Sequence, residues 1–380
     1  MKVVHVSPSF FPAYAYGGPT ESVYRLCCHL GRKGHNIRVL TTDANGPTAV
    51  LDSAQGREIE MGEGLHVRYC RRLLRHSVSP TLLRLLPSYI RWADVVHLTA
   101  VYSFPTIPTL LTCMLLGKPV VWSPRGSLQS WRGGIPRSIV KAVWDRLCRA
   151  IASERLILHV TSEEEGRESR ERFPSIKAAV ISNGVEVPEK VEHRQGNSVL
   201  RLLYLGRLHP KKAIENLLLA CQMLAGQGMS PWSLTIVGAG DQSYTQSIRA
   251  RIDELKIGRQ VRMVGEVYGD VKQALFENVD IVVMPSHTEN FGLVVAEALA
   301  HGVPVIASKG TPWKRIDDVG CGLWVDNDPE SLAKALARMS RMPLREMGQR
   351  GRQWIQREFS WDERAKEMAD LYYTISQRTS

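Results

Sequence analysis

Short apolar runs alternate with segments of helical period along almost the whole chain. Residues 2–8 have the composition of a strand, and residues 20–33 then place Val23, Leu26, Cys27 and Leu30 at the 3.6-residue spacing of an amphipathic helix. Repeated alternation of this kind is typical of a parallel sheet with helices on both faces. The first half of the chain is therefore expected to form a doubly wound α/β domain.

The same pattern predicts the other elements of this half. Strands are expected at residues 36–42, 95–98, 119–123, 156–160 and 178–182. Helices are expected at residues 80–92, 106–116, 136–153 and 163–173.

The alternation stops at residues 183–198, which are polar and contain two glycines and one proline. We interpret this segment as the end of one domain followed by a linker. Beyond it, strands are expected at residues 201–205, 233–237, 260–264, 280–284, 303–307 and 322–325. Helices are expected at residues 212–227, 244–256, 271–278, 291–300, 329–341, 344–358 and 362–377. Ligands of such sheets bind at the carboxyl ends of the strands, so two facing domains would place the site in the cleft between them.

Composition excludes a fibrous or disordered chain, because 44% of the residues are apolar and 23% are charged. The net charge of +11 favours partners with phosphate groups, such as nucleotides, anionic lipid or nucleic acid. Seven cysteines without a CxxC motif argue against a disulfide framework or zinc ribbon and fit a reduced cytosol. Residues 1–11 have the pattern of a strand rather than a signal peptide, and the prolines within residues 95–117 argue against a spanning helix.

The strongest chemical signal is the segment PSHTENFGLVVAEALAHGVPVIAS at residues 285–308, where Glu289 and Glu297 are eight positions apart. A strand ends before Glu289, and a helix begins near the sequence Asn290–Phe291–Gly292–Leu293. The free N–H groups of a helix start can bind an anion or sugar oxygens, and a carboxylate on each side can accept hydrogen bonds from hydroxyls. The structural alternative is one helix-start glutamate and one unrelated surface glutamate.

A second signal, LYLGRLHPKK at residues 203–212, places Arg207 and Lys212 between a strand and a helix, where they could hold two phosphates. Two glycine-containing turns also follow strands. Gly238 lies in IVGAG, and Gly17 and Gly18 lie in YAYGGPTES. Each pattern alone also fits a basic loop or a tight turn. Their common position between strand and helix favours one binding site.

Together these motifs resemble those of glycosyltransferase family 4, the retaining nucleotide-sugar enzymes of GT-B fold. The resemblance is carried by Gly17–Gly18, Asn183–Gly184–Val185, Gly206–Arg207 with Lys212, Gly238–Ala239–Gly240, and the pair Glu289 and Glu297. It implies a 1–185 acceptor-binding domain with residues 361–380 packed back onto it, a linker at 186–198, and a 199–360 nucleotide-sugar-binding domain.

The resemblance also implies a role for each site residue. Arg207 and Lys212 would hold the donor diphosphate in place of a metal, and Glu297 would bind the ribose. Glu289 and the backbone of Phe291–Leu293 would hold the transferred sugar, and the Gly265–Val267 backbone would lie near the base. Gly17 and Gly18 would line the reaction centre. No cofactor is expected, because the nucleotide-sugar is a co-substrate.

Several positions depart from the family pattern. Ala213 follows Lys212, where the family usually has glycine, and Arg125 in WSPRGSLQSW stands where many members have a histidine. Arg125 cannot act as a base but could bind a sugar hydroxyl or an anionic acceptor. His97 is another candidate for substrate binding, although a strand-end histidine with its hydrogen bonds made inside the protein explains it better. The sequence Asp326–Asn327–Asp328 matches a metal-binding DxD formally, but its place before Pro329 is better explained by helix capping.

Residues 64–93 contain no acidic residue, and six arginines are interleaved with leucines there. Such a segment could lie on anionic lipid or bind the pyrophosphate of a lipid-linked acceptor. The alternative is that the leucines face the core and the arginines face solvent. The first reading predicts a cytoplasmic protein that associates peripherally with the inner face of the cytoplasmic membrane.

With this resemblance, the sequence predicts a metal-independent hexosyltransferase. It would move a sugar from a UDP- or GDP-sugar to a saccharide acceptor that is linked to a lipid. The resemblance places it in bacterial polysaccharide biosynthesis, as of O-antigen, lipopolysaccharide, capsule or exopolysaccharide. Three alternatives remain open at this stage: another GT-B enzyme such as a nucleotide-sugar epimerase or sucrose-type synthase, a catalytically silent relative, and a basic nucleic-acid-binding protein. Against the nucleic-acid-binding alternative, the basic residues of the sequence form no helix-turn-helix and no aromatic-studded strand motif.

Overall fold

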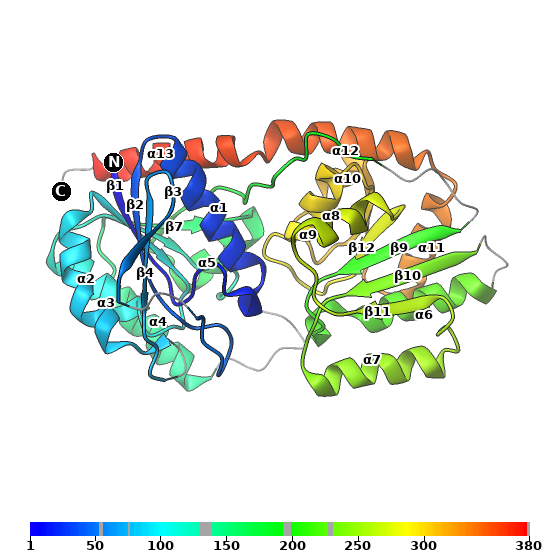
Figure 1. The fold of residues 1–380 in the computed structure, drawn as a ribbon, viewed down its shortest axis with the longest axis horizontal. Coiled ribbons are helices and arrows are strands. Elements are labelled where there is room, and N and C mark those ends of the chain that lie inside the picture. The colour runs from blue at the N-terminus through cyan, green and yellow to red at the C-terminus, as the bar shows by residue number, and fades with distance from the viewer. Residues whose placement is uncertain (53–55, 75–76, 130–137, 193–198, 227–230, 378–380) are drawn as a thin grey trace. The chain divides into compact units, whose positions relative to one another are not determined.

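The computed structural model describes residues 1–52, 56–74, 77–129, 138–192, 199–226 and 231–377. These residues form two compact units (Figure 1). The first unit contains the described residues up to 184 and those from 361 onward. The second unit contains the described residues of 185–360.

The first unit is built on an eight-stranded sheet with the order β3-β4-β2-β1-β5-β6-β7-β8. Its strands are β1 (Lys2–Val6), β2 (Asn36–Thr42), β3 (Glu58–Gly62), β4 (Leu65–Cys70), β5 (Val95–Thr99), β6 (Val120–Ser123), β7 (Leu156–Val160) and β8 (Lys177–Val180). All neighbours pair in parallel except β3, which runs antiparallel to β4. The sequence analysis expected no strand between residues 42 and 95, so β3 and β4 correct it.

Two helical layers cover this sheet. Its helices are α1 (Gly18–Arg32), α2 (Pro80–Trp92), α3 (Thr106–Leu115), α4 (Ile139–Ile151), α5 (Glu163–Arg172) and α13 (Trp361–Ser376), with a short 3-10 turn η1 (Tyr14–Tyr16). Side chains of α2, α3 and α4 share a buried cluster with one face of the sheet. Those of α1 and α13 share a second cluster with the other face.

Helix α13 completes the first unit although it is the last element of the chain. Trp361, Met368 and Tyr372 are buried in the cluster that also contains Leu26 and Leu30 of α1. Where the chain leaves the first unit at Gly184, a Cβ on this residue would lie 2.5 Å from the ring of Trp361, where the chain returns. Only glycine therefore lets the chain pass this indole.

The second unit contains a six-stranded parallel sheet with the order β11-β10-β9-β12-β13-β14. Its strands are β9 (Leu200–Leu205), β10 (Trp232–Val237), β11 (Val261–Val264), β12 (Ile281–Met284), β13 (Val305–Ser308) and β14 (Gly322–Val325). The chain proceeds from β9 outward to β11, and then returns to place β12 on the other side of β9. The point between β9 and β12 is therefore the topological switch, where a doubly wound sheet opens a crevice at its carboxyl edge.

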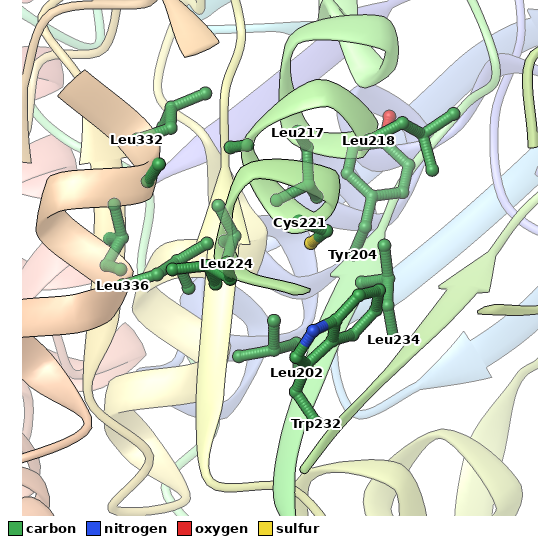
Figure 2. Close-up of a cluster of buried hydrophobic side chains, with 14 of the residues drawn as sticks. Leu202, Tyr204, Leu217, Leu218, Cys221, Leu224, Trp232, Leu234, Leu332 and Leu336 are labelled. Atoms are coloured by element: carbon green, nitrogen blue, oxygen red, sulfur yellow. The ribbon is translucent and has the colours of Figure 1, made fainter. Parts of the chain in front are cut away.

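Helices cover both faces of this second sheet. They are α6 (Ile214–Gly226), α7 (Gln242–Glu254), α8 (Gly269–Glu277), α9 (Leu293–Ala300), α10 (Arg315–Val319), α11 (Pro329–Met339) and α12 (Leu344–Glu358), with a 3-10 turn η3 (Pro210–Lys212). On one face, leucines of α6 and α11 meet above Trp232 and Leu234 of β10 (Figure 2). On the other face, side chains of α8, α9 and α12 surround Val282 and Val305. The sequence analysis did not predict the five-residue helix α10.

All seven cysteines are free, and six of them are buried. Burial raises the pKa of Cys113, Cys148, Cys221 and Cys321 to about 12. These thiols therefore stay protonated and unreactive in the folded chain. Among the described helices, none is both long enough and apolar enough to cross a bilayer.

Candidate active site

The loops that follow β9 and β12 meet at the switch point of the second sheet. Lys212, at the end of η3, forms an ion pair with Glu289, and both side chains are mostly buried. The backbone joins the same two loops, because the N–H of His287 donates to the carbonyl of Lys211 at 2.8 Å. Two residues that the sequence predicted for one site, 77 positions apart, are thus brought together.

Glu289 is held as a carboxylate. Burial alone disfavours its charged form, but the Lys212 ammonium and the Ser286 hydroxyl, which donates to Oε1 at 2.7 Å, outweigh burial and lower the pKa of Glu289. Its backbone N–H donates to the carbonyl of Gly310 at 2.9 Å. The side chain is therefore charged, oriented and fixed before any ligand arrives.

The residue after Lys212 explains one departure from the family pattern. Ala213 has φ 48° and ψ 44°, which is the left-handed region that favours glycine. The usual glycine at this position is therefore a backbone requirement of the turn. Here an alanine adopts the same conformation, at a cost of about 1–2 kcal/mol.

A cavity of about 410 Å³ lies at the carboxyl ends of β10 and β11. Gly238 and Gly265, both predicted as site residues, are in its wall. Gln246 and Arg249 of α7 also line it, although no sequence motif marked them. A Cβ on Gly238 would lie 2.0 Å from the carbonyl oxygen of Gly206, so this glycine also lets two strand-end turns pack together.

The start of α9 has the backbone geometry of an anion-binding site. Gly292 precedes the helix in the left-handed conformation, with φ 75° and no side-chain cap. Helix starts leave their first N–H groups without partners four residues back; here the Val295 N–H donates to the carbonyl of Gly292 at 2.9 Å, so Leu293 and Val294 supply the donors of the first turn. Trp313 fixes this turn, because its indole N–H donates to the carbonyl of Phe291 at 2.5 Å. Trp313 therefore acts as a positioning residue for the start of α9.

Glu297 lies on α9 with a different partner from Glu289. Lys272 of α8 donates to its Oε1 at 2.6 Å, and its Oε2 is buried with no hydrogen-bond partner among the described residues. A buried acceptor without a donor costs free energy unless a ligand supplies one. Lys272 was missed by the sequence analysis, since it stands 25 positions away in an unremarkable helix.

Arg207 is exposed, and its guanidinium has no ion pair or hydrogen bond to any described residue. Its carbonyl accepts a hydrogen bond from the Tyr204 hydroxyl at 2.9 Å, which fixes the backbone while leaving the side chain free. Val267, in the loop after β11, packs against the buried cluster on the α9 face. The Lys212–Glu289 ion pair and the Arg207 guanidinium thus both lie on loops at the carboxyl edge of the second sheet.

The DxD sequence has a structural role at Asp328. Its carboxylate accepts a hydrogen bond from the backbone N–H of Ser331 at 2.8 Å and so caps α11. This confirms the capping interpretation. Among the described residues, no group of three histidine, cysteine or acidic side chains is arranged to hold a metal ion.

In the first unit, Gly17 and Gly18 form the N-terminal boundary of α1 after the first strand. Gly17 has φ 69° and is the N-cap, Gly18 is the first helical residue, and a Cβ on Gly17 would meet nothing within 4 Å. The conformation rather than crowding requires glycine at Gly17.

His97 is a core residue of the first unit. It is fully buried in β5, and its ring nitrogens lie 2.5 Å from the Tyr372 hydroxyl and 2.6 Å from the Ser123 hydroxyl. Both ring nitrogens of His97 are therefore occupied within the core of the first unit, which agrees with the structural alternative.

Arg125 follows β6 in a strained conformation with φ 53°. Its guanidinium donates to the Asn183 side chain at 2.5 Å, while its Nε is buried without a partner among the described residues. Non-glycine residues in this region of φ are uncommon and cluster at functional sites. Arg125 thus remains a candidate for substrate binding.

Comparisons with known proteins divide the chain at the same place as the structure. Residues 16–188 match the family model "Glycosyltransferase Family 4", and residues 188–354 match "Glycosyl transferases group 1". An uncharacterized glycosyltransferase of Methanocaldococcus jannaschii is 31% identical over 217 residues. That alignment covers 52% of this chain and spans about half of the relative, 54% of its length.

Solved structures resemble the chain over its full length. Sucrose-phosphate synthase from Thermosynechococcus elongatus matches with a TM-score of 0.74, 20% identity and 99% coverage of both chains. Anabaena HepE in complex with UDP and glucose matches with a TM-score of 0.72, 16% identity, and coverage of 98% of this chain and 100% of HepE. At these identities the likeness shows the fold, which is that of the two-domain GT-B transferases.

Proposed function

Because this chain belongs to glycosyltransferase family 4 and has the GT-B fold, we propose that it transfers a sugar from a nucleoside diphosphate sugar to a saccharide acceptor with retention of configuration. The donor is a UDP- or GDP-sugar, and the acceptor is lipid-linked, as in the assembly of a bacterial surface polysaccharide. The UDP complex of the similarly folded HepE supports the nucleotide part of this proposal.

One observation carries the proposal. A cavity of about 410 Å³, an ion pair across the topological switch and the open start of α9 belong to the same carboxyl edge of one sheet. Such an edge is where doubly wound folds bind nucleotides. The cavity suits the base, and the cations and helix start suit the phosphates and the sugar.

Different residues of the site bind different parts of the donor molecule. Arg207 is unengaged and can reach a phosphate oxygen, and Lys212 supplies the second positive charge. The unpartnered Oε2 of Glu297 can accept a hydrogen bond from a ribose hydroxyl. Glu289 and the N–H groups at Phe291–Leu293 can hold the hydroxyls of the transferred sugar.

In the reaction the acceptor oxygen bonds to the anomeric carbon while the bond from that carbon to the diphosphate oxygen breaks. The acceptor proton passes to a phosphate oxygen on the same face of the sugar. Negative charge grows on the leaving diphosphate, and Arg207 and Lys212 stabilise it. Positioned cations thus supply the stabilisation that a metal ion gives in other transferases.

A thermal-shift panel of UDP-, GDP- and ADP-sugars tests this function. One nucleotide class is expected to raise the melting temperature of the protein by mass action, because it binds only the native state. Arg207→Ala should abolish most of that increase while leaving the melting temperature of the free protein unchanged, since its side chain contacts nothing that stabilises the fold. Lys334→Ala, which removes an exposed cation from the solvent side of α11, is the matched control and should retain the full increase.

No increase with any nucleotide sugar would contradict the proposal. Consumption of the nucleotide sugar to an epimer in the absence of acceptor would favour the epimerase alternative instead. Product anomeric configuration, read by NMR, checks retention.

A further inference from the structure

Helix α4 of the first unit has its apolar residues on the outside. Ile139, Val140, Val143 and Leu147 are 84%, 73%, 52% and 49% exposed. These positions follow helical spacing and form one stripe along the helix. The charged residue Asp145 is instead buried, where it accepts a hydrogen bond from the Tyr102 hydroxyl at 2.9 Å. An amphipathic helix of a soluble domain ordinarily has the opposite arrangement.

The exposed apolar surface continues onto neighbouring α3. This helix packs between α2 and α4 in the layer that covers one face of the first sheet (Figure 1). Leu111, Met114 and Leu115 of α3 are exposed, and Leu115 is 73% exposed. We call the exposed residues of α3 and α4 the α3–α4 face.

The exposed charged residues of α2, α3 and α4 all have one sign. Lys141, Arg146 and Arg149 are exposed on α4, and Arg84 and Arg91 are exposed on α2. The only acidic residue in the three helices is the buried Asp145. A large exposed apolar patch marks an interaction site, and exclusively basic flanks fit a partner surface that is apolar inside and anionic outside.

We propose that the α3–α4 face docks the first unit onto an anionic lipid bilayer, with α4 lying in the membrane interface. Apolar side chains of α4 enter the boundary between headgroups and acyl chains, while its lysine and arginines contact lipid phosphates. This proposal goes beyond the proposed function, because it concerns where the enzyme works rather than what its donor site binds.

The structure also moves the membrane contact away from the first part of residues 64–93. Leu65 and Val67 are buried in β4. Arg68 donates to the carbonyl of Gly56 at 2.8 Å, and Arg72 donates to the carbonyls of Gly46 and Ala49 at 2.7 and 2.8 Å. These arginines are engaged within the protein, and Arg75 lies outside the described residues. Leu73 and Leu74 are exposed in this segment, and its helix α2 packs beside α3 of the α3–α4 face.

Co-sedimentation of the full chain with vesicles tests the proposal. Vesicles with about one third phosphatidylserine should bind the protein at low salt, whereas pure phosphatidylcholine vesicles should bind it at least tenfold more weakly. The triple variant Lys141→Gln/Arg146→Gln/Arg149→Gln should weaken binding about 100-fold, at about fivefold for each charge removed. The triple variant Ile139→Ser/Val143→Ser/Leu147→Ser should weaken binding at least tenfold.

Matched controls lie on the second unit. Met223→Ser on α6 removes an exposed apolar side chain, and Arg345→Gln on α12 removes an exposed charge. Neither should change vesicle binding. All variants should keep the melting-temperature increase with nucleotide sugar, so a failure here is distinguishable from failure of the donor site.

Two results would overturn the proposal. The first is an absence of binding to anionic vesicles at low salt. The second is concentration-dependent self-association of the wild-type chain that the Ile139/Val143/Leu147 variant abolishes, without vesicle binding, which would assign the face to a second copy of this chain.

Discussion

Two glycines near the donor site perform different tasks. Gly292 has a left-handed backbone, and a Cβ there would lie 3.1 Å from Sδ of Met284 and 3.2 Å from Nε1 of Trp313. Gly265 has no such backbone requirement, and a Cβ on it would meet nothing within 4 Å. Gly292 therefore shapes the start of α9, whereas Gly265 leaves room in the wall of the cavity.

The variants Gly292→Ala and Gly265→Ala should separate these tasks. Gly292→Ala should lower the free energy of unfolding by about 1–2 kcal/mol, because alanine is strained in this conformation. Gly265→Ala should change it by less than about 0.5 kcal/mol, yet weaken nucleotide-sugar binding by placing a methyl group in the cavity. Urea unfolding and ligand titration measure the two effects. Equal loss of stability in both variants would refute the distinction.

For individual residues, the sequence predicted which residue types belong to the site but not which side chains they contact. Glu289 and Lys212 were expected at one site, and their ion pair agrees with that expectation. The pairing of Glu297 with Lys272 and the support of Phe291 by Trp313 had no sequence signal. Both depend on how separate elements pack, which local spacing does not encode.

Secondary-structure elements were predictable where their apolar pattern was strong. The six strands of the second sheet all match the expected segments to within two residues at either end, because each is a short, mostly apolar run bounded by turns. Strands β3 and β4 were missed for a physical reason. Glu58–Gly62 alternates polar and apolar residues at a sheet edge, and Arg68 in Leu65–Cys70, with Arg71 and Arg72 directly after it, gave this segment the composition of a basic surface.

A buried histidine network joins four strands of the first sheet to α13. His5 of β1 stacks on His97 of β5 with ring centroids 4.3 Å apart, and the Ser123 hydroxyl of β6 bridges His97 to His159 of β7 at 2.6 and 2.7 Å. The Tyr372 hydroxyl of α13 completes the network. Burial, with a smaller effect of the nearby Arg125 charge, lowers the pKa of His5 and His159 to about 3.

This network should make the first unit sensitive to mild acid. Above pH 6.5 these histidines are neutral in both the folded and unfolded chain. Between about pH 6.5 and 3 the unfolded chain binds protons that the folded chain does not, so stability falls as pH falls. The expected loss from pH 7.5 to 5.5 is about 1.4 kcal/mol for each of the three histidines.

Urea unfolding at the two pH values measures this loss. His159→Asn should remove about one third of the loss that the three network histidines cause. A free energy of unfolding that is independent of pH over this range would show that the network takes up protons while folded.

The whole molecule has two separate sets of hydrophobic clusters. Each described cluster draws its residues from one unit alone, with two clusters on the faces of each sheet. Because each unit has its own core, stability gained in one unit need not pass to the other.

A nucleoside diphosphate should therefore protect the two units unequally. Hydrogen exchange should slow in the strands and site loops of residues 199–360 when the preferred nucleotide is added. Exchange in β1–β8 should stay the same, since the predicted diphosphate and base contacts all belong to the second unit. Mass spectrometry of peptides from both units provides the comparison, and uniform protection of both sheets would contradict it.

The buried cysteines can serve as chemical probes of local unfolding, because they do not react while the chain is folded. A small alkylating reagent should modify half-buried Cys28 first, because the other six cysteines become accessible only when their surroundings open. Cys27, Cys70, Cys113 and Cys148 would time such openings in the first unit, and Cys221 and Cys321 in the second. Alkylation of the native cysteines can thus measure local opening of the first and second units separately, without an engineered label.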